Sequence, residues 1–170
     1  MDAAHFVLGA FACMMWCFVR TWVKAPSGRQ RFNVLGAINA VTKEVITVTN
    51  TAYINSHCVC ELLQKIVSLG LTVPVTIILD NARYQRCAMV QTLAASLQIE
   101  LLFLPAYSPN LNLIERLWKF VKKQCLYAKY YPTFDLFSAA IADCLKQTRT
   151  THRKALASLL TLHFQTFEAT

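Results

Sequence analysis

The most constraining feature of the sequence is a short apolar segment, Val75–Leu79, that ends abruptly on Asp80. Short apolar runs rich in β-branched residues are typical of strands buried on both faces of a parallel sheet. In open α/β sheets, ligands bind outside the carboxyl ends of such strands. The segment therefore predicts a buried strand with a candidate functional carboxylate, Asp80, at its carboxyl end.

The residues that follow predict a helix, a second strand and a second helix. Apolar residues recur at helical spacing over 86–97, and Ile99–Leu104 has the composition of a strand. After a proline-containing loop, we expect a helix over about 110–128. This helix carries Glu115 in its first turns, with thirty-four residues between it and Asp80. Two acids are thus predicted at a strand end and a helix start.

The N-terminal segment Ala3–Val19 has seventeen residues without a charge. A membrane-spanning helix needs roughly 20 apolar residues, and a signal peptide opens with basic residues, whereas this segment follows Asp2. We therefore expect a buried strand followed by a hairpin or turn, and no membrane association. A small membrane-anchored protein is the alternative that this segment leaves open.

Other segments complete a mixed α/β pattern. Alternating apolar residues predict strands over 32–41 and 44–50, joined by a turn. Asn55 or Ser56 is a suitable cap for a helix that ends at Gly70. A last long helix is expected over Phe134–Thr148, and the tail has the composition of one more short helix. The predicted order is three strands followed by alternating helices and strands.

Length and composition favour one folded domain with an anionic partner. The chain has 170 residues, 55% apolar residues and a formal net charge of +8. That charge favours nucleic acid or an anionic membrane surface over a neutral partner. The seven cysteines are an odd number and are scattered among apolar neighbours, which indicates reduced thiols in a cytosolic protein. Cys58 and Cys60 lack a second ligand pair, so we expect no zinc site there.

Four segments resemble the catalytic domain of DDE transposases. These segments are MDAAHF at the start, GRQRFNVLGAINAVTKEVITVTN, LDNARYQ around Asp80 and LPAYSPNLNLIERLW around Glu115. The resemblance covers nearly the whole chain and is closest to the bacterial insertion-sequence relatives of the mariner superfamily. It implies a ribonuclease-H-like fold, in which a mixed five-stranded sheet carries helices on both faces. It also implies metal-dependent DNA cleavage and strand transfer at transposon ends.

The resemblance assigns Asp2, Asp80 and Glu115 as a metal-binding catalytic triad. It implies two Mg²⁺ or Mn²⁺ ions, with Asp2 bridging both and the other two acids each holding one. Carboxylate oxygens suit such hard ions, and two ions stabilise the attacking and leaving oxygens of phosphodiester cleavage. It further implies DNA as the partner, a homodimer, no small-molecule substrate, and a bacterial cytoplasmic, nucleoid-associated protein.

Each acid also has an ordinary structural interpretation. Asp80 can begin a turn, and Asp2 can be a solvated residue at a frayed end. Asn112 and Glu115 match a capping box, whereas a helix that starts at Ser108 leaves Glu115 free in the second turn. The residues alone leave these alternatives open.

Several further residues are candidates for DNA contacts or for orienting the acids. Basic side chains follow Glu115 along the predicted helix, and two arginines precede the second strand; the candidate phosphate contacts are Arg29, Arg31, Arg116, Lys119, Lys122 and Lys123. The alternative for the helix is an ordinary Glu115–Lys119 surface pair. Asn81 and Asn112 are candidates to orient the acids from behind. Many relatives carry histidine where this chain has Gln85, so no role is assigned there.

The helix-turn-helix modules that such transposases use to recognise DNA ends do not precede Asp2 in this sequence. We therefore expect residues 1–170 to form one catalytic domain without sequence-specific DNA binding of its own. Two alternatives remain: an inert transposase remnant that acts by dimerisation, and a ribonuclease-H-like RNA nuclease.

Overall fold

The computed structural model of the chain describes residues 1–9, 18–19, 30–105, 108–127 and 129–164. The hairpin expected after the first strand, and Arg29, lie outside these residues. Strands and helices follow in the predicted order: β1 (Asp2–Val7), β2 (Arg31–Ile38), β3 (Val45–Asn50), α1 (Ser56–Val67), β4 (Val75–Leu79), α2 (Ala88–Ser96), β5 (Ile99–Phe103), α3 (Leu113–Cys125), α4 (Phe134–Lys146) and α5 (Arg153–Leu159), with short 3₁₀ turns at Pro109–Leu111 and Gln147–Arg149.

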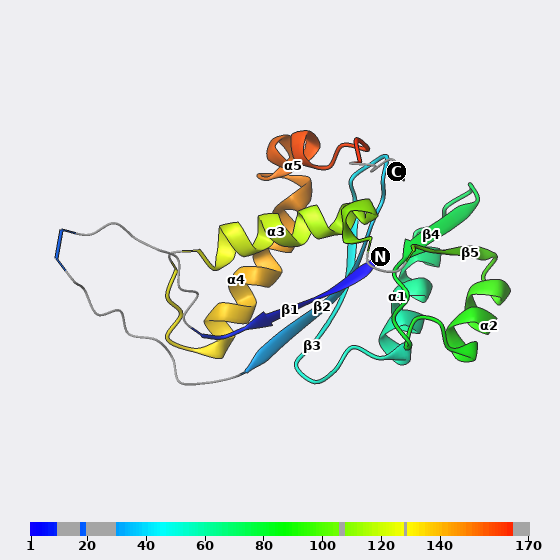
Figure 1. The fold of residues 1–170 in the computed structure, drawn as a ribbon, viewed down its shortest axis with the longest axis horizontal. Coiled ribbons are helices and arrows are strands. Elements are labelled where there is room, and N and C mark those ends of the chain that lie inside the picture. The colour runs from blue at the N-terminus through cyan, green and yellow to red at the C-terminus, as the bar shows by residue number, and fades with distance from the viewer. Residues whose placement is uncertain (10–17, 20–29, 106–107, 128, 165–170) are drawn as a thin grey trace, which may run out of the picture.

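The first three strands form an antiparallel sheet in the order β1-β2-β3. Asp2 pairs with Gly36, which pairs in turn with Thr47, so these residues lie in one row across the sheet. Alternate side chains face opposite sides: Phe6 and Val34 pack with α3 and α4 in one core, and Leu35 packs with α1 in a second core. Helices therefore cover both faces of this sheet, as the resemblance implied (Figure 1).

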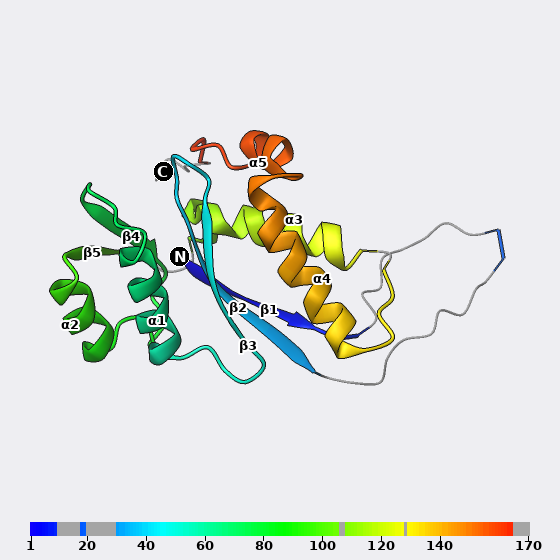
Figure 2. The ribbon, with the colours of Figure 1, turned by 180° about the vertical axis from the view of Figure 1, so that it is seen from behind.

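The remaining two strands form a separate parallel sheet, in which Val75 pairs with Ile99. All five strands of the implied sheet are present, but in this structure they are divided, because β1 and β4 are not joined by a ladder. The residue before β1 contacts β4, since the Met1 amino group donates a hydrogen bond of 2.6 Å to the carbonyl oxygen of Ile78. Seen from the opposite side in Figure 2, the β4–β5 unit with α1 and α2 lies beside the three-stranded sheet.

The prediction that β4 is buried on both faces is wrong. Ile77 and Leu79 are buried, whereas Ile78 is 44% exposed and its neighbour on β5, Leu102, is 50% exposed. The physical reason is that Ile77 and Leu79 face the core formed with α1 and α2, while α3 packs on β1 and β2 and leaves the other face of β4 uncovered. The apolar run thus forms a strand with one buried face.

Helix ends largely follow the predicted signals. The side chain of Asn55 caps α1 by accepting a hydrogen bond of 3.2 Å from the backbone N–H of Cys58. Gly70 has φ +64°, the left-handed conformation that favours glycine after a helix. The helix expected from about Asn110 is shorter, because a 3₁₀ turn comes first and α3 begins only at Leu113. Within the described residues, none of the helices has the length and apolarity that crossing a bilayer requires.

The packing of α3 on the sheet depends on a close approach at Gly36. The Trp118 ring lies over this glycine, and a Cβ added there would come within 2.7 Å of the ring atom Cη2. Trp118 is 2% exposed, and its ring meets Phe6 edge to face at a centroid distance of 6.5 Å. A β-carbon at this position would therefore displace the largest side chain of the core.

We expect Gly36→Ala to lower the free energy of unfolding by about 1–3 kcal/mol, because overpacking forces the Trp118 ring and α3 to shift. Thermal unfolding followed by circular dichroism measures this. Gly9→Ala is the matched control, since an added Cβ there meets nothing within 4 Å. Equal melting temperatures for the two variants would contradict the packing argument.

Candidate active site

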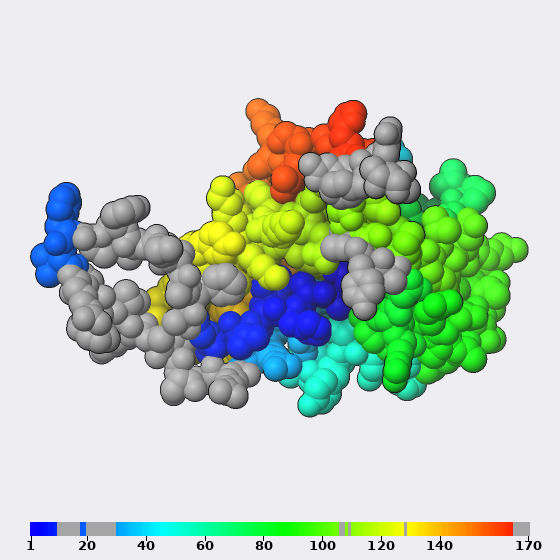
Figure 3. Space-filling model, in the orientation of Figure 1, coloured from blue at the N-terminus to red at the C-terminus, as the bar shows by residue number. Residues whose placement is uncertain are grey.

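The three acids come from three different parts of the fold. Asp2 is the first residue of β1, Asp80 follows β4 directly, and Glu115 is in the first turn of α3. Because the residue before Asp2 is bonded to Ile78 near the end of β4, Asp2 and Asp80 lie on either side of the same junction. The start of β1 is flanked in the space-filling view by α3 on one side and by the β4–α2 region on the other (Figure 3).

Asp2 lies in a crowded and largely dry environment. It is 9% exposed, and its pKa is raised to about 6, mainly by burial. The negative charges of Glu115 and Asp80 contribute to this rise in pKa, whereas a backbone hydrogen bond from Ala3 and the N-terminal amino group oppose it. Asp2 thus lies within reach of the charges of both other acids, and the frayed, solvated interpretation of Asp2 is wrong.

Each acid is held differently. One carboxylate oxygen of Asp2, Oδ2, accepts a hydrogen bond of 3.1 Å from the indole N–H of Trp118. The Oδ1 atom of Asp80 is buried and has no hydrogen-bond partner among the described residues. The Met1 amino group is buried beside both acids, and that burial lowers its pKa to about 6, although the charges of Asp2 and Asp80 oppose the shift.

The oxygen-rich cluster fits a divalent cation, whose charge would offset the repulsion that Glu115 and Asp80 exert on Asp2. Among the described residues, however, no three His, Cys, Asp or Glu side chains are already arranged around one common point. The side chains must therefore move toward a bound ion, so the triad stays a prediction.

The two asparagines predicted to orient the acids make different contacts. Asn112 is at the N-cap position of α3, but its side chain makes no cap bond and donates 3.4 Å to the carbonyl oxygen of Met1. It therefore links the start of the Glu115 helix to the residue before Asp2. Asn81 donates to the carbonyl oxygen of Leu104, which ties the loop after β4 to the loop after β5.

Sequence reasoning placed Trp118 beside Glu115 on one helix face but missed its bond to Asp2, and it missed Tyr84 altogether. Burial, followed by the charges of Asp80 and Asp2, raises the pKa of Tyr84 to about 12. The adjacent Gln85 is fully buried, and neither of its amide atoms has a hydrogen-bond partner. The position of Trp118 one turn after Glu115 was the available signal, because residues three apart share a helix face.

The candidate phosphate contacts on α3 are separated by the structure into two groups. Lys119 and Lys123 are exposed and Lys122 is half-buried. The alternative Glu115–Lys119 pair is not among the ion pairs of the described residues. Arg31 is exposed but pairs with Val7, five residues along β1 from Asp2 and hence roughly 17 Å away.

Arg116 belongs to the second group, because its guanidinium is hydrogen-bonded to the C-terminal segment of the chain. It donates to the carbonyl oxygens of Thr161 at 2.8 Å and His163 at 2.7 Å, and more weakly to that of Leu159 at 3.4 Å. It also lies over the ring of Phe164, 5.4 Å from the centroid. Arg116 thus fastens the C-terminal segment to α3, and this arrangement does not favour the predicted DNA contact.

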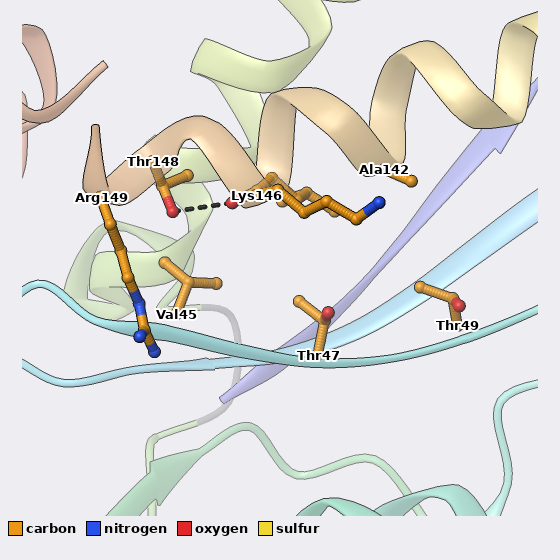
Figure 4. Close-up of a pocket in the computed structure, with 8 residues that line it drawn as sticks. Val45, Thr47, Thr49, Ala142, Lys146, Thr148 and Arg149 are labelled. Atoms are coloured by element: carbon orange, nitrogen blue, oxygen red, sulfur yellow. Dashed lines mark hydrogen bonds between the residues drawn. The ribbon is translucent and has the colours of Figure 1, made fainter. Parts of the chain in front are cut away.

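A groove of about 410 Å³ lies between β3 and α4 (Figure 4). Thr47 and Thr49 form one wall, and Lys146 and Arg149 lie on the other. The groove shares a sheet face with Asp2, but Trp118 covers Gly36 between them. It is therefore separate from the acids.

Comparisons with solved structures define the class of fold. The Mos1 mariner paired-end complex with Mn matches with a TM-score of 0.59 and 13% identity, over 98% of this chain and 55% of that chain. The HTLV-2 integrase catalytic core domain in complex with magnesium, a dimeric form, matches with a TM-score of 0.57 and 16% identity, over 88% of this chain and 83% of that one. The fold is therefore the ribonuclease-H-like fold of transposase and integrase catalytic cores.

The sequence identifies the family. Residues 19–138 match the DDE superfamily endonuclease family, so the chain belongs to this family. The simian T-cell lymphotropic virus intasome in complex with the PP2A regulatory subunit B56 gamma also matches, with a TM-score of 0.58 and 18% identity, over 88% of this chain and 47% of that one. The chain thus spans about half the length of the Mos1 transposase and of this intasome chain. No curated protein sequence matches it significantly.

We expect the Asp2 carboxyl to make folding stability depend on pH. Its pKa rises from 3.8 to about 6 on folding, so the neutral form is favoured in the folded state. Its contribution is complete below pH 4 and is lost as pH rises through 6. At pH 7.5, Asp2→Asn should therefore unfold with a free energy about 2–3 kcal/mol higher than the unchanged chain, and the difference should vanish near pH 4. Urea titrations at both pH values measure this, and a pH-independent difference would contradict it.

We expect Arg116→Ala to release the C-terminal segment, because hydrogen bonds to a charged donor each contribute about 1.5–3 kcal/mol. NMR order parameters of the backbone at Thr161 and His163 should fall. Lys119→Ala is the matched control on the same helix, and it should leave these order parameters unchanged while weakening DNA binding. Unchanged order parameters at both residues in Arg116→Ala would show that other contacts hold the segment.

Proposed function

We propose that this chain cuts and joins DNA strands as the catalytic domain of a transposase, with Asp2, Asp80 and Glu115 as its metal-binding acids. The observation that supports the proposal is that Asp2, at the start of β1, lies within reach of the charges of Asp80 at the end of β4 and of Glu115 at the start of α3. Membership of the DDE superfamily endonuclease family supports the same activity. The metal dependence is supported by the magnesium and manganese in two of the similar structures.

The chemistry follows from the oxygen donors. Bound Mg²⁺ or Mn²⁺, in the two-ion arrangement, would activate the attacking oxygen and stabilise the leaving 3′ oxygen. Residues around the acids would hold them in position for these ions. Trp118 holds Asp2 through its indole N–H, and Asn112 fastens the start of α3 to Met1, so that Glu115 and Asp2 keep a fixed relation. Asp2 is buried, so little water surrounds its carboxylate, and the attraction between this carboxylate and a bound cation would be stronger than in water.

The helix α3 also offers a path for the DNA backbone. Glu115, Lys119 and Lys122 follow one another at i, i+4 and i+7 and therefore lie along one side of the helix. Seven residues of helix span roughly 10 Å, which is about three nucleotides of one strand at roughly 3.4 Å each. A DNA strand whose phosphates contact Lys122 and Lys119 would therefore pass next to Glu115. Such contacts position DNA without reading its sequence.

Other features of the proposal rest on the resemblance alone. These are the transposon ends as substrate, target DNA as second partner, a homodimer, and a bacterial, nucleoid-associated origin. The dimeric form of the HTLV-2 integrase core is consistent with a dimer.

We expect the purified chain to nick plasmid DNA in the presence of Mn²⁺ or Mg²⁺, and Asp80→Asn to reduce nicking to background, because the loss of a carboxylate removes a metal ligand. Asp143→Asn is the matched control, since Asp143 forms only an exposed surface pair with Lys146. Gel assays on supercoiled plasmid and on an RNA–DNA hybrid measure both activities.

Equal residual nicking in Asp80→Asn and Asp143→Asn would exclude the triad mechanism. Absence of nicking by the unchanged chain would favour the inert remnant, and cleavage of the hybrid alone would favour the RNA nuclease.

A further inference from the structure

The buried polar atoms without a partner are concentrated in one turn. Among the described residues, the buried side-chain atoms that lack a hydrogen bond are Oδ1 of Asp80 and both amide atoms of Gln85. A buried polar group without a partner costs about 1–3 kcal/mol, so each such group in a native fold requires an explanation. Gln85 is fully buried, although glutamine is mostly a surface residue.

The turn that carries these atoms is firmly held. The backbone N–H of Gln85 donates 3.0 Å to the carbonyl oxygen of Ala82, which closes the turn. The guanidinium of Arg86 lies over the ring of Phe103 at 5.1 Å, and Asn81 is bonded to Leu104. The position of Gln85 is therefore fixed by its neighbours, and its side chain has no route to solvent.

The unpaired atoms are chemically complementary. Asp80 Oδ1 is an acceptor without a donor, and Gln85 Nε2 is a donor without an acceptor. The pKa of Tyr84 responds to the charge of Asp80 and to the side chain of Gln85, so the three groups belong to one neighbourhood. The Tyr84 hydroxyl could donate to the remaining atom, Gln85 Oε1. A chain of donors from Tyr84 through Gln85 to Asp80 would satisfy all three unpaired atoms.

We propose that Gln85 is a positioning residue for Asp80. Its amide donates to Oδ1 of the carboxylate, directly or through one buried water, and so leaves the other carboxylate oxygen oriented toward a divalent cation. This inference rests on the proposed function, because it gives Asp80 the role of a metal ligand. Groups that hydrogen-bond a ligating carboxylate typically change metal affinity about 10- to 100-fold.

The test compares Mn²⁺ affinity in three variants, measured by electron paramagnetic resonance of free Mn²⁺. Gln85→Met has a similar volume but no donor, and we expect it to bind Mn²⁺ about 10- to 100-fold more weakly. Gln85→His restores one donor and one acceptor and should recover most of the affinity. Gln64→Met changes an exposed glutamine of α1 and should bind as the unchanged chain does. Unchanged affinity in Gln85→Met would overturn the proposal.

A second measurement needs no metal. The side-chain amide protons of Gln85 should exchange slowly with solvent, and their NMR shifts should change in Asp80→Asn but not in Asp143→Asn. If these shifts do not respond to Asp80→Asn, the positioning role is overturned. If they respond while the unchanged chain binds no Mn²⁺, Gln85 holds Asp80 but the proposed metal-dependent function fails.

Discussion

The contact between Trp118 and the first strand is the interaction on which the candidate site depends. The ring lies on Gly36 in the middle strand, meets Phe6 edge to face, and donates its indole N–H to Asp2. One side chain thus fixes the height of α3 above the sheet and the direction of the first acid. Glu115 is three residues earlier on the same helix, so its position relative to Asp2 follows from the same contact. A rigid element that carries one ligand while it orients another is how proteins hold metal ligands accurately.

The second acid is placed by the packing of β4 against the rest of the fold. The three-stranded and two-stranded sheets share one core around α1, which holds Leu35 of β2 and Leu79 of β4. Near the acids, the hydrogen bond from Met1 to Ile78 and that from Asn112 to the carbonyl oxygen of Met1 connect the start of β1 with β4 and α3. Asp2 and Asp80 are next to this junction, and a small displacement of the two sheets changes the distance between them. A cation held by both acids would stabilise the junction, because it replaces like-charge repulsion with attraction.

The order of elements and the position of most helices were predictable from local patterns. Asn55 was recognised as a cap because its side chain contacts a backbone group only three residues away, and Gly70 because its conformation is local. The burial of β4 was not predictable in this way. Ile77 and Ile78 have the same chemistry, and only the positions of α1, α2 and α3 decide that one is buried and the other exposed.

The candidate site shows the same division. The three acids were found from motifs that resemble a known family, yet their mutual repulsion depends on distances between β1, β4 and α3 that no local pattern encodes. Arg116 illustrates the limit well, since its spacing from Glu115 suggests a surface cation. Its actual partners are carbonyl groups 45 and 47 residues later in the chain. Trp118 was predicted beside Glu115 on the face that packs on the sheet, but its bond to Asp2 and the place of Tyr84 were missed, because both depend on contacts between distant parts of the chain.

Stability and function oppose each other where β1, β4 and α3 meet. Asp2, Asp80 and Gln85 are polar groups in places where apolar side chains of similar volume would fold more favourably. A few residues away, Phe6, Trp118 and Ile114 form an apolar core that carries no such cost. A cation bound by the acids would offset part of the cost, because a ligand that binds only the folded state stabilises it. The Gln85 amide is neutral, so its cost is offset by a partner such as Asp80 and not by the cation itself.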